Sequence, residues 1–464
     1  MVTAASPRLV VAAPGSGHGK TTVATGLLAA LRRRGTEVAP FKVGPDYIDP
    51  GYHRVAAGRP ARNLDPVLVG EERIVPLFRH GSAGADLSVV EGVMGLFDGR
   101  IGTGADGPAF GSTAHVAGML DAPVVLVVDA RGQSQSLAAL LHGFRSFQPG
   151  VRIGGVILNR VGSARHEEVL RDAAEAAGLA VLGALPRTDG LEVPSRHLGL
   201  ITAAEHGPQA STAVAAMADV VERAVDLDSV VALAKATAPL EGGTWEAGAE
   251  VERGPGRPVV AVAGGPAFTF GYAEHVELLE AAGAEVAVVD PLRDELLPDG
   301  TAGLVLPGGL PEQHVAELSA NSLLRKDIAA FAASGAPVHA ECGGLLYLAA
   351  ELDGHPMCGV LDARAEMSPK LTLGYRDAVA GADSPLFAEG NRVSGHEFHR
   401  TVVNPGSGAR PAWRWRASGV VAEGFVHGGV HASYLHTHPA GQPGAIDRFV
   451  GAMRHRNGAT GHHT

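Results

Sequence analysis

Short apolar runs alternate with longer amphipathic stretches along the N-terminal half of the chain. The runs that have the length of buried strands lie at 9–13, 38–42, 87–91, 124–129 and 155–159. Between them, the stretches 21–34 and 165–177 place Ala and Leu at helical spacing. Strands that alternate with helices in this way predict a mostly parallel, buried sheet with helices on both faces.

The same alternation returns in the C-terminal half after an interruption. Between 226 and 257 the chain is rich in Gly, Pro and Glu, which predicts an interdomain linker. We therefore predict an α/β protein with two domains, 1–225 and 258–464, each a mostly parallel sheet flanked by helices. The strand-length runs of the second domain lie at 259–263, 285–290, 303–307 and 337–341.

Composition agrees with two packed domains and excludes several classes of protein. The chain has 464 residues, of which 45% are hydrophobic and 19% charged, so two cores of ordinary size are expected. A net charge of −11 argues against a nucleic-acid partner held by bulk electrostatics. The two cysteines make neither a disulfide framework nor a metal-binding spacing. Because neither a signal-peptide pattern nor an apolar stretch of membrane-spanning length occurs, we expect a cytoplasmic enzyme without a membrane partner.

The first predicted strand leads into the sequence PGSGHGKTT, which is followed by a helical stretch. Glycines let a backbone wrap closely around phosphate oxygens, the amides at a helix start point toward them, and the lysine adds charge. We therefore predict a nucleotide-phosphate site rather than a turn that only begins a helix, although Pro14 stands where the strict pattern has glycine. The residues predicted to bind the nucleotide here are Gly17, Gly19, Lys20, Thr21 and Thr22.

Acidic residues follow two further predicted strands. Asp46 and Asp49 lie in FKVGPDYIDPGYH, and Glu91 and Asp98 lie in EGVMGLFDG. The carboxyl ends of parallel strands share one edge of the sheet, where a magnesium nucleotide needs one or two carboxylates besides the loop hydroxyl. Any one of these acids alone is compatible with a helix cap or a turn, but their clustering beside glycines predicts part of an active site.

A cysteine follows the last predicted strand. Cys342 comes after PVHAE and before a glycine pair and a helical stretch. A strand–Cys–helix turn presents a thiol at a helix N-terminus, and we expect this position to lower the pKa of the thiol. Gly308 and Gly309 follow another strand, and their amides are candidates to stabilise an oxyanion.

A base for this cysteine is expected near the C-terminus. The sequence GGVHASYLHTH offers His431, His436 and His438, and such a base meets its nucleophile in space rather than in sequence. Cys358 has no glycine turn beside it and is predicted to be a core thiol.

Together these segments resemble a known family, cobyrinic acid a,c-diamide synthase and its cobalt-free counterpart, hydrogenobyrinic acid a,c-diamide synthase. The N-terminal half is similar to dethiobiotin synthetase, and the C-terminal half is similar to class I glutamine amidotransferases. The resemblance spans almost the whole chain. The matching stretches are KVGPDYIDPGYH, GRPARNLDP, EGVMGLFDG, GVILNRV, PSRHLGL, LPGGLPE, AECGGLLYL, GHEFH and HASYLHTH.

The resemblance implies an ATP- and glutamine-dependent carbon–nitrogen ligase of cobalamin biosynthesis. ATP would phosphorylate the a- and c-acetate carboxylates of a corrin ring in turn, and ammonia from L-glutamine would displace phosphate to give two amides. The family implies Mg²⁺ as a cofactor, and its members are often dimers, so a homodimer is compatible with it. The Ala-, Gly- and Arg-rich composition is typical of high-GC, often aerobic bacteria and favours the cobalt-free ring.

The resemblance also assigns roles to single residues. Lys20 would hold the phosphates, and Asn159 matches the residue that reads adenine in dethiobiotin synthetase. Cys342 would be the nucleophile and His436 its base, whereas His438 stands where class I enzymes usually carry glutamate, which leaves the third member of the triad open. The implied Mg²⁺ ligands are Thr21, Asp46 and Glu91. The residues implied to face the substrate carboxylate or the transferred phosphate are Lys42, Tyr47, Asp49 and Asp98.

Two other functions remain as alternatives. A cobyric acid synthase would share the cysteine turn and the phosphate loop but would amidate other corrin side chains, and it should lack KVGPDYIDP. A partitioning-type ATPase, which is a switch rather than a ligase, would carry a signature lysine where this chain has Gly15, and it would not need a cysteine at such a turn. A requirement of phosphate release for a corrinoid would distinguish the ligase from the switch.

Overall fold

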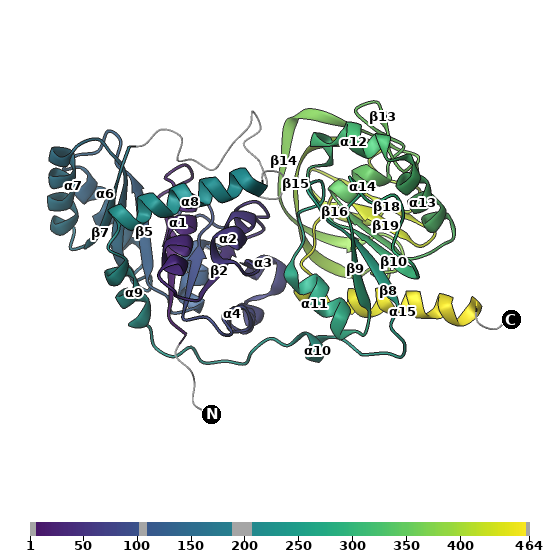
Figure 1. Ribbon diagram of the computed structural model, residues 1–464, viewed down its shortest axis with the longest axis horizontal. Coiled ribbons are helices and arrows are strands. Elements are labelled where there is room, and N and C mark those ends of the chain that lie inside the picture. The colour runs from purple at the N-terminus through teal and green to yellow at the C-terminus, as the bar shows by residue number, and fades with distance from the viewer. Residues whose placement is uncertain (1–5, 102–108, 188–206, 461–464) are drawn as a thin grey trace. The chain divides into compact units, whose positions relative to one another are not determined.

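The computed structural model describes residues 6–101, 109–187 and 207–460, and it forms two compact units, Met1–Trp245 and Glu246–Thr464 (Figure 1). Both units contain a mostly parallel sheet with helices packed around it, so the predicted α/β class is confirmed. The stretch PSRHLGL lies outside the described residues. Within the described residues, no helix combines the length and the apolar character that a membrane crossing requires.

The first unit is built on a parallel sheet that has seven strands among the described residues, in the order β3-β2-β4-β1-β5-β6-β7. The strands are β1 (Arg8–Ala12), β2 (Val38–Val43), β3 (Arg62–Leu64), β4 (Leu87–Glu91), β5 (Val124–Asp129), β6 (Ile153–Val161) and β7 (Val181–Pro186). The helices are α1 (Lys20–Arg33), α2 (Asp49–Ala57), α3 (Pro66–Val69), α4 (Ile74–Gly81), α5 (Thr113–Met119), α6 (Leu137–Phe147), α7 (Ala164–Ala176), α8 (Gly207–Ala224) and α9 (Leu227–Lys235), with a 3₁₀ turn at η1 (Glu71–Arg73).

Burial of the sheet explains the apolar runs in the sequence. Strands β1, β2 and β4 are buried along their whole length, as strands of a parallel sheet covered on both faces are. The predicted strands at 9–13, 38–42, 87–91 and 124–129 match β1, β2, β4 and β5 to within one residue, and 155–159 forms the middle of the longer β6.

The strand order places β1 at a reversal of the chain path. From β1 the chain crosses over to β2, two positions away, and it later adds β4 and β5 on either side of β1. At such a reversal the loops after neighbouring strands diverge and leave a crevice at the carboxyl edge of the sheet. The glycine-rich loop after β1 begins at this crevice, and the acidic segments after β2 and β4 lie beside it.

The boundary between the two units lies inside the predicted linker, 226–257, and the first part of that linker is structured. Helix α9 packs against β1, β4 and β7, and the Asp226 side chain accepts the Ser229 N–H to cap its start. Trp245 is buried, with 2% of its surface exposed. The apolar residues of α9 recur at helical spacing, a signal that the Gly-, Pro- and Glu-rich composition of the neighbouring residues obscures.

The second unit contains a sheet of six strands among its described residues, in the order β18-β19-β11-β10-β8-β9, parallel except for β18. Its strands are β8 (Val259–Ala263), β9 (Glu285–Val289), β10 (Thr301–Leu306), β11 (Val338–Glu341), β18 (Phe425–His427) and β19 (Val430–Ser433). The helices are α10 (Ala247–Glu250), α11 (Ala273–Ala281), α12 (Val315–Ala320), α13 (Ser322–Ala333), α14 (Gly343–Leu348) and α15 (Pro443–Thr460), with 3₁₀ turns η2 (Pro311–Gln313) and η3 (Pro439–Gly441).

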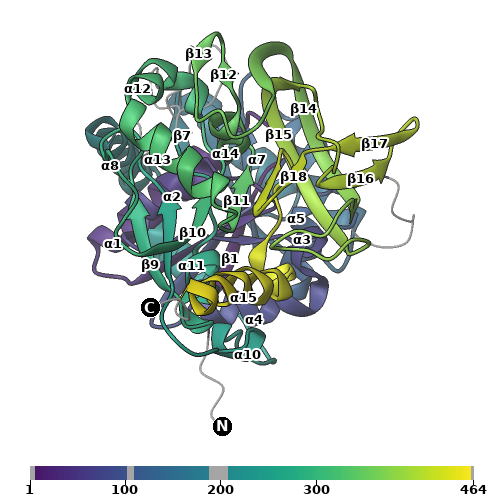
Figure 2. The same ribbon diagram turned by 90° about the vertical axis from the view of Figure 1, so that its right-hand side faces the viewer.

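A further, mainly antiparallel sheet in this unit has no counterpart in the sequence analysis. Figure 2 shows its long hairpin of β14 and β15 at the edge of the unit. Its pairing shifts register between Met367 and Thr372, so the alternation of buried and exposed residues is interrupted and a simple strand pattern is lost. The strands are β12 (Glu351–Leu352), β13 (His355–Pro356), β14 (Arg364–Ala380), β15 (Arg392–Asn404), β16 (Trp413–Arg416) and β17 (Val420–Glu423).

Candidate active sites

The loop after β1 has the backbone that a phosphate cradle requires. Gly17 and Gly19 have φ angles of 81° and 94°, in the left-handed region that glycine adopts without a steric penalty. At Gly19 a Cβ atom would also collide with the side-chain amide of Asn159. Asn159 in turn donates from Nδ2 to the carbonyl oxygen of His18 at 2.9 Å, which fixes the predicted adenine-reading residue against the loop.

Lys20 is the first residue of α1, and its ammonium group is held by backbone carbonyls. Nζ donates to the oxygens of Gly15 at 3.1 Å and Met94 at 2.5 Å. Burial lowers the pKa of Lys20 to about 8, helped by the charge of Lys42 and opposed by nearby carboxylates that include the exposed Asp98. With this pKa the ammonium group is still mostly charged at neutral pH, and a bound anion would raise its pKa again.

Next to Lys20, a hydroxyl, two carboxylates and a second lysine converge. Thr21 Oγ1 donates to Glu91 Oε1 at 2.7 Å and to Asp49 Oδ2 at 3.2 Å. Lys42 Nζ lies 2.6 Å from Asp49 Oδ2 and 2.9 Å from Glu91 Oε1, and its side chain is 3% exposed. Burial alone would lower the pKa of Lys42, but the carboxylates raise it well above its ordinary value. Lys42 offsets only one of the two negative charges that face Thr21. Burial and the charges of Asp46 and Glu91 raise the pKa of Asp49 well above its ordinary value.

The other oxygen of Glu91 has a partner that the sequence analysis did not single out. His53 Nε2, on α2, lies 2.7 Å from Glu91 Oε2, and both side chains are essentially fully buried. Burial opposes ionisation of Glu91, yet Lys42 and His53 together hold its pKa well below the ordinary range. His53 stands in the quoted stretch KVGPDYIDPGYH, where its spacing from Asp49 on one helix was the available signal.

The remaining predicted residues of this unit surround the cluster. Asp46 Oδ1 accepts the backbone N–H groups of Ile48 at 2.8 Å and Asp49 at 3.2 Å at the start of α2, and its other oxygen lies 3.7 Å from Lys42 Nζ. Asp98 Oδ2 accepts the N–H of Gly95 at 2.8 Å. Two half-buried residues complete the set, Thr22 in the first turn of α1 and Tyr47 in the loop before α2.

This donor set fits Mg²⁺ bound together with a nucleotide. Magnesium prefers oxygen ligands and is usually held by one or two carboxylates plus substrate phosphates. Thr21, Glu91 and Asp49 supply a hydroxyl and two carboxylates at the phosphate loop. Within the part of the chain that the structure describes, no group of three His, Cys, Asp or Glu side chains is placed to hold a metal ion.

In the second unit, Cys342 occupies a strained turn between β11 and α14. Its φ and ψ are 48° and −100°, a backbone conformation that a residue with a Cβ rarely adopts. At Gly344 a Cβ atom would collide with the carbonyl oxygen of Leu306, so the glycines let α14 begin against β10. The turn presents the thiol at the carboxyl edge of the sheet, with Sγ 3.9 Å from the carbonyl oxygen of Phe398.

Neighbouring strands bring the predicted partners of Cys342 together. Strand β11 lies between β10 and β19, and the segments after these strands carry Gly308, Gly309 and His436. The amide nitrogen of Gly309 is 2.9 Å from the place a Cβ of Gly343 would take, so it lies beside the start of α14. A Cβ at Gly308 would collide with His436 Cε1, so the imidazole packs directly on this glycine.

The expectation of a lowered thiol pKa at Cys342 is wrong for the free protein. Burial raises the pKa of the Cys342 thiol, and the charges of Glu312, Glu341 and Glu397 add to this effect. The amide of Gly343 opposes them but does not prevail. Because the side chain is only 4% exposed, desolvation of a thiolate outweighs the short helix behind it.

The three candidate histidines have different surroundings. His436 is buried, and its Nδ1 lies 3.6 Å from Glu341 Oε2. His438 Nδ1 accepts the N–H of Ala440 at 3.2 Å, and its ring lies against Tyr272 at a centroid distance of 4.0 Å. His431 sits within β19, where burial lowers its pKa to about 3. Cys358 is buried in the hydrophobic core, as predicted.

Comparison with known proteins agrees with this pair of sites. Residues 9–201 match the model of the CobQ/CobB/MinD/ParA nucleotide binding domain. Residues 259–443 match the model of the CobB/CobQ-like glutamine amidotransferase domain. The phosphate loop lies in the first match, and Cys342, Gly308 and His436 lie in the second.

Curated relatives match nearly the whole chain. Hydrogenobyrinate a,c-diamide synthase of Mycobacterium tuberculosis is 62% identical over 95% of this chain and 97% of its own length. The protein of the same name from Streptomyces coelicolor is 58% identical over 97% and 98%. Cobyrinate a,c-diamide synthase of a Synechococcus species is 41% identical over 96% and 98%. With this identity along its full length, the chain belongs to the family of hydrogenobyrinate and cobyrinate a,c-diamide synthases, ligases that take nitrogen from glutamine.

Proposed function

We propose that this protein amidates the a- and c-acetate carboxylates of hydrogenobyrinic acid, with ATP and L-glutamine as co-substrates and Mg²⁺ as cofactor. The observation that carries the proposal is that one chain combines the phosphate-loop cluster of Thr21, Lys42 and Glu91 with the strained Cys342 turn. The relatives at 62% and 58% identity are named for the cobalt-free substrate, and the one at 41% for the cobalt-containing one. The higher sequence identity to the relatives named for the cobalt-free substrate favours the cobalt-free ring.

The first unit activates the carboxylate. Backbone amides of the loop and Lys20 bind the phosphates of ATP, while Lys42 stands where a substrate carboxylate or the transferred phosphoryl group carries negative charge. The carboxylate oxygen attacks the γ-phosphorus, the bond to the β-phosphate oxygen breaks, and an acyl phosphate and ADP result. Bound Mg²⁺ would neutralise phosphate charge at Thr21, Glu91 and Asp49.

The second unit releases ammonia. His436 accepts the proton of Cys342, the thiolate attacks the side-chain carbonyl of glutamine, and amides near Gly309 stabilise the oxyanion. Ammonia leaves with a proton from the imidazolium, and water hydrolyses the thioester to glutamate. Ammonia then attacks the acyl phosphate and displaces phosphate, which gives the amide.

Product analysis tests the proposal. Purified protein is incubated with ATP, Mg²⁺, glutamine and either hydrogenobyrinic or cobyrinic acid, and products are read by mass and by the position of each amide. We expect two amides, at the a and c side chains, with higher kcat/KM on the cobalt-free acid. Amides on other side chains would indicate the cobyric acid synthase alternative, and equal efficiency on both acids would contradict the choice of ring.

We further propose that Asp49, more than Asp46, acts beside Thr21 at the metal. Asp49 shares Thr21 Oγ1 with Glu91, whereas Asp46 uses one oxygen to accept the N–H groups of Ile48 and Asp49 in the turn that leads into α2. Asp49→Asn should therefore lose most Mg²⁺-dependent ATP affinity, about tenfold or more, because loss of even an outer-shell partner of a metal ligand costs about 10–100-fold. Asp46→Asn keeps the oxygen that accepts the two N–H groups and should change ATP affinity little.

Calorimetric titration with ATP, at several Mg²⁺ concentrations, measures both variants. Each variant lacks one carboxylate of the wild-type chain, and the two substituted residues lie in the same turn. Each variant is therefore the control for the other. A weak ATP site in Asp46→Asn beside a normal one in Asp49→Asn would restore the original assignment of Asp46 to the metal and Asp49 to the substrate.

A further inference from the structure

We propose that Glu341, the residue before the nucleophile, is the positioning residue that orients His436 and stabilises its imidazolium. The inference rests only on the glutaminase half of the proposed function. Class I enzymes usually carry a glutamate two residues after the base, where this chain has His438. In this chain the carboxylate comes from Glu341 at the end of β11, which precedes the base in sequence instead of following it.

Sheet pairing explains how Glu341 reaches His436. Glu341 is the last residue of β11, and its register partner on β19 is Ser433. The chain then runs from Ser433 to His436 along the same edge of the sheet. As a result Glu341 Oε2 lies 3.6 Å from His436 Nδ1, the nitrogen opposite the one that would face the thiol.

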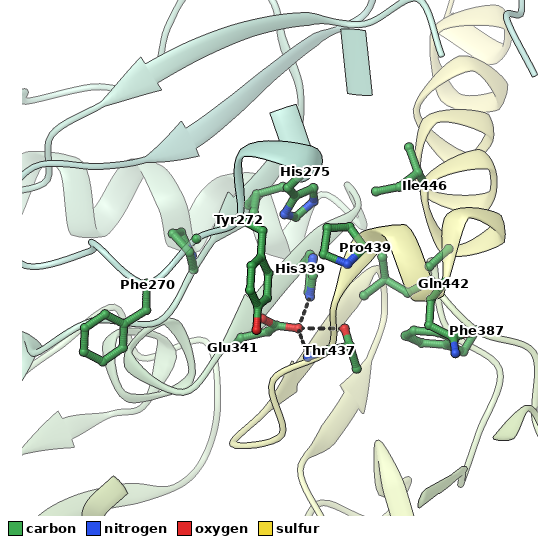
Figure 3. Close-up of a pocket in the computed structure, with 15 residues that line it drawn as sticks. Phe270, Tyr272, His275, His339, Glu341, Phe387, Thr437, Pro439, Gln442 and Ile446 are labelled. Atoms are coloured by element: carbon green, nitrogen blue, oxygen red, sulfur yellow. Dashed lines mark hydrogen bonds and ion pairs between the residues drawn. The ribbon is translucent and has the colours of Figure 1, made fainter. Parts of the chain in front are cut away.

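The other oxygen of Glu341 is fixed by two separate segments. Oε1 accepts the backbone N–H of Thr437 at 3.1 Å and its hydroxyl at 3.0 Å, and His339 Nε2 lies 3.2 Å away. Figure 3 shows the carboxylate between His339 and Thr437. With Oε1 held from both sides, Oε2 is directed to the imidazole, as a positioning carboxylate must be.

The neighbours of Glu341 favour its ionised form. Burial opposes its ionisation, but His339 and His436 hold the pKa of this carboxyl well below the ordinary value. A small cavity of about 30 Å³ also borders it, with Tyr272, His275 and Gln442 in its lining. That volume exceeds the roughly 10–15 Å³ that one water molecule needs, so the cavity has room for a water molecule beside the carboxylate.

His438 is less suited to this role. Its Nδ1 accepts the Ala440 N–H and its ring lies against Tyr272. A neutral imidazole carries no negative charge, so it can orient a base but adds little electrostatic stabilisation to an imidazolium. Glu341 supplies both the orientation and the charge.

Removal of Glu341 should change the rate of Cys342 alkylation in the direction opposite to the one that the loss of a nearby negative charge alone would cause. As a nearby negative charge, Glu341 disfavours the Cys342 thiolate, so removing it would speed thiol alkylation at neutral pH. As the partner of His436, it favours the thiolate–imidazolium pair, so removing it would slow alkylation. Glu312 is a matched control because its charge also raises the pKa of Cys342.

The experiment uses the full chain with Cys358→Ala, which leaves Cys342 as the single thiol. Alkylation by iodoacetamide is followed across pH, together with glutamine hydrolysis. For Glu341→Gln we expect slower alkylation at neutral pH, a profile moved to higher pH, and glutaminase kcat lowered about tenfold or more with KM for glutamine little changed. For Glu312→Gln we expect faster alkylation. The titratable groups that face Glu341 and can shape the profile are His275, His339, His431, His436 and Cys342.

Faster alkylation of Glu341→Gln than of the parent, or an unchanged glutaminase kcat, would overturn the proposal. If thermal unfolding shows that Glu341→Gln does not fold, Glu341→Asp decides: it keeps the charge but withdraws it from His436, so its alkylation must be slower than the parent's, and an equal or faster rate overturns the proposal. None of these measurements needs ATP or a corrin. A protein that follows them yet amidates no corrin would contradict the proposed function alone.

Discussion

Replacement of Cys342 by alanine is expected to abolish glutamine-dependent amidation while ammonium-dependent amidation survives. Loss of a covalent nucleophile removes the thioester route altogether, and comparable losses in hydrolases reach about 10⁴-fold or more in kcat. The phosphate loop, Thr21 and Lys42 belong to the other compact unit and keep all their contacts. With ammonium salt as nitrogen donor, turnover should therefore stay within about twofold of the wild-type value, as expected for independent sites.

The measurement is amide formation with glutamine and, separately, with ammonium chloride, at saturating ATP and corrin acid. Cys358→Ala is the control, because it removes the other thiol from the core and leaves the Cys342 turn in place. A Cys342→Ala protein that unfolds at the wild-type temperature but has lost the ammonium-dependent reaction would show that the two chemistries are not divided between the units as proposed.

Local sequence was sufficient for the features that depend on neighbouring residues. The buried strands β1 and β4 of the first sheet consist mainly of apolar residues, because both of their faces are covered. The phosphate loop and the Cys342 turn are likewise short segments in which glycines meet a backbone requirement, seen in the φ of Gly19 and in the close approach of Gly344 to Leu306. Phosphate binding by the loop and nucleophilic chemistry at the Cys342 turn could therefore be predicted from the sequence alone.

Contacts between distant segments were not predictable in the same way. The pairing of Glu341 with His436 depends on β11 and β19 being neighbours, although the whole sheet of β12 to β17 lies between them in sequence. The thiol pKa of Cys342 was expected to fall because of its helix, yet the burial that raises it comes from the whole unit. The burial of a group and the charges around it depend on residues from many parts of the fold, and a local sequence pattern carries no information about those residues.

The sequence did not distinguish the roles of Asp46 and Asp49. The two residues are both aspartates close in sequence, and either one satisfies the chemistry of a metal ligand. Their geometry is decided by where α2 begins, because Asp46, in the turn before the N-cap Ile48, directs one oxygen toward the N–H groups of Ile48 and Asp49. Where a helix starts is less certain from sequence than this difference requires, because helix boundaries vary by one or two residues.

Replacement of Lys20 by alanine is expected to abolish amidation with either nitrogen donor. The lysine supplies the positive charge that binds the phosphates and stabilises the charge transferred with the phosphoryl group, and removal of one such preorganised group costs about 10²–10³-fold or more in kcat. Lys42→Ala would be a poorer test, because it would leave Glu91 and Asp49 buried without their cation and so threaten the fold.

Lys20 avoids that ambiguity because its ammonium group contacts the carbonyl oxygens of Gly15 and Met94 rather than a buried carboxylate. Its removal leaves two backbone carbonyl acceptors without this donor, which costs less than leaving a buried charge unpaired. The variant should unfold near the wild-type temperature, keep Cys342 alkylation unchanged, and fail in ATP-dependent phosphate release with both glutamine and ammonium chloride. Lys20→Arg keeps the charge but spreads it over a planar group, so we expect partial phosphate binding and low turnover. Ammonium-dependent amidation at the wild-type rate in Lys20→Ala would contradict the assignment of the phosphate site to this loop.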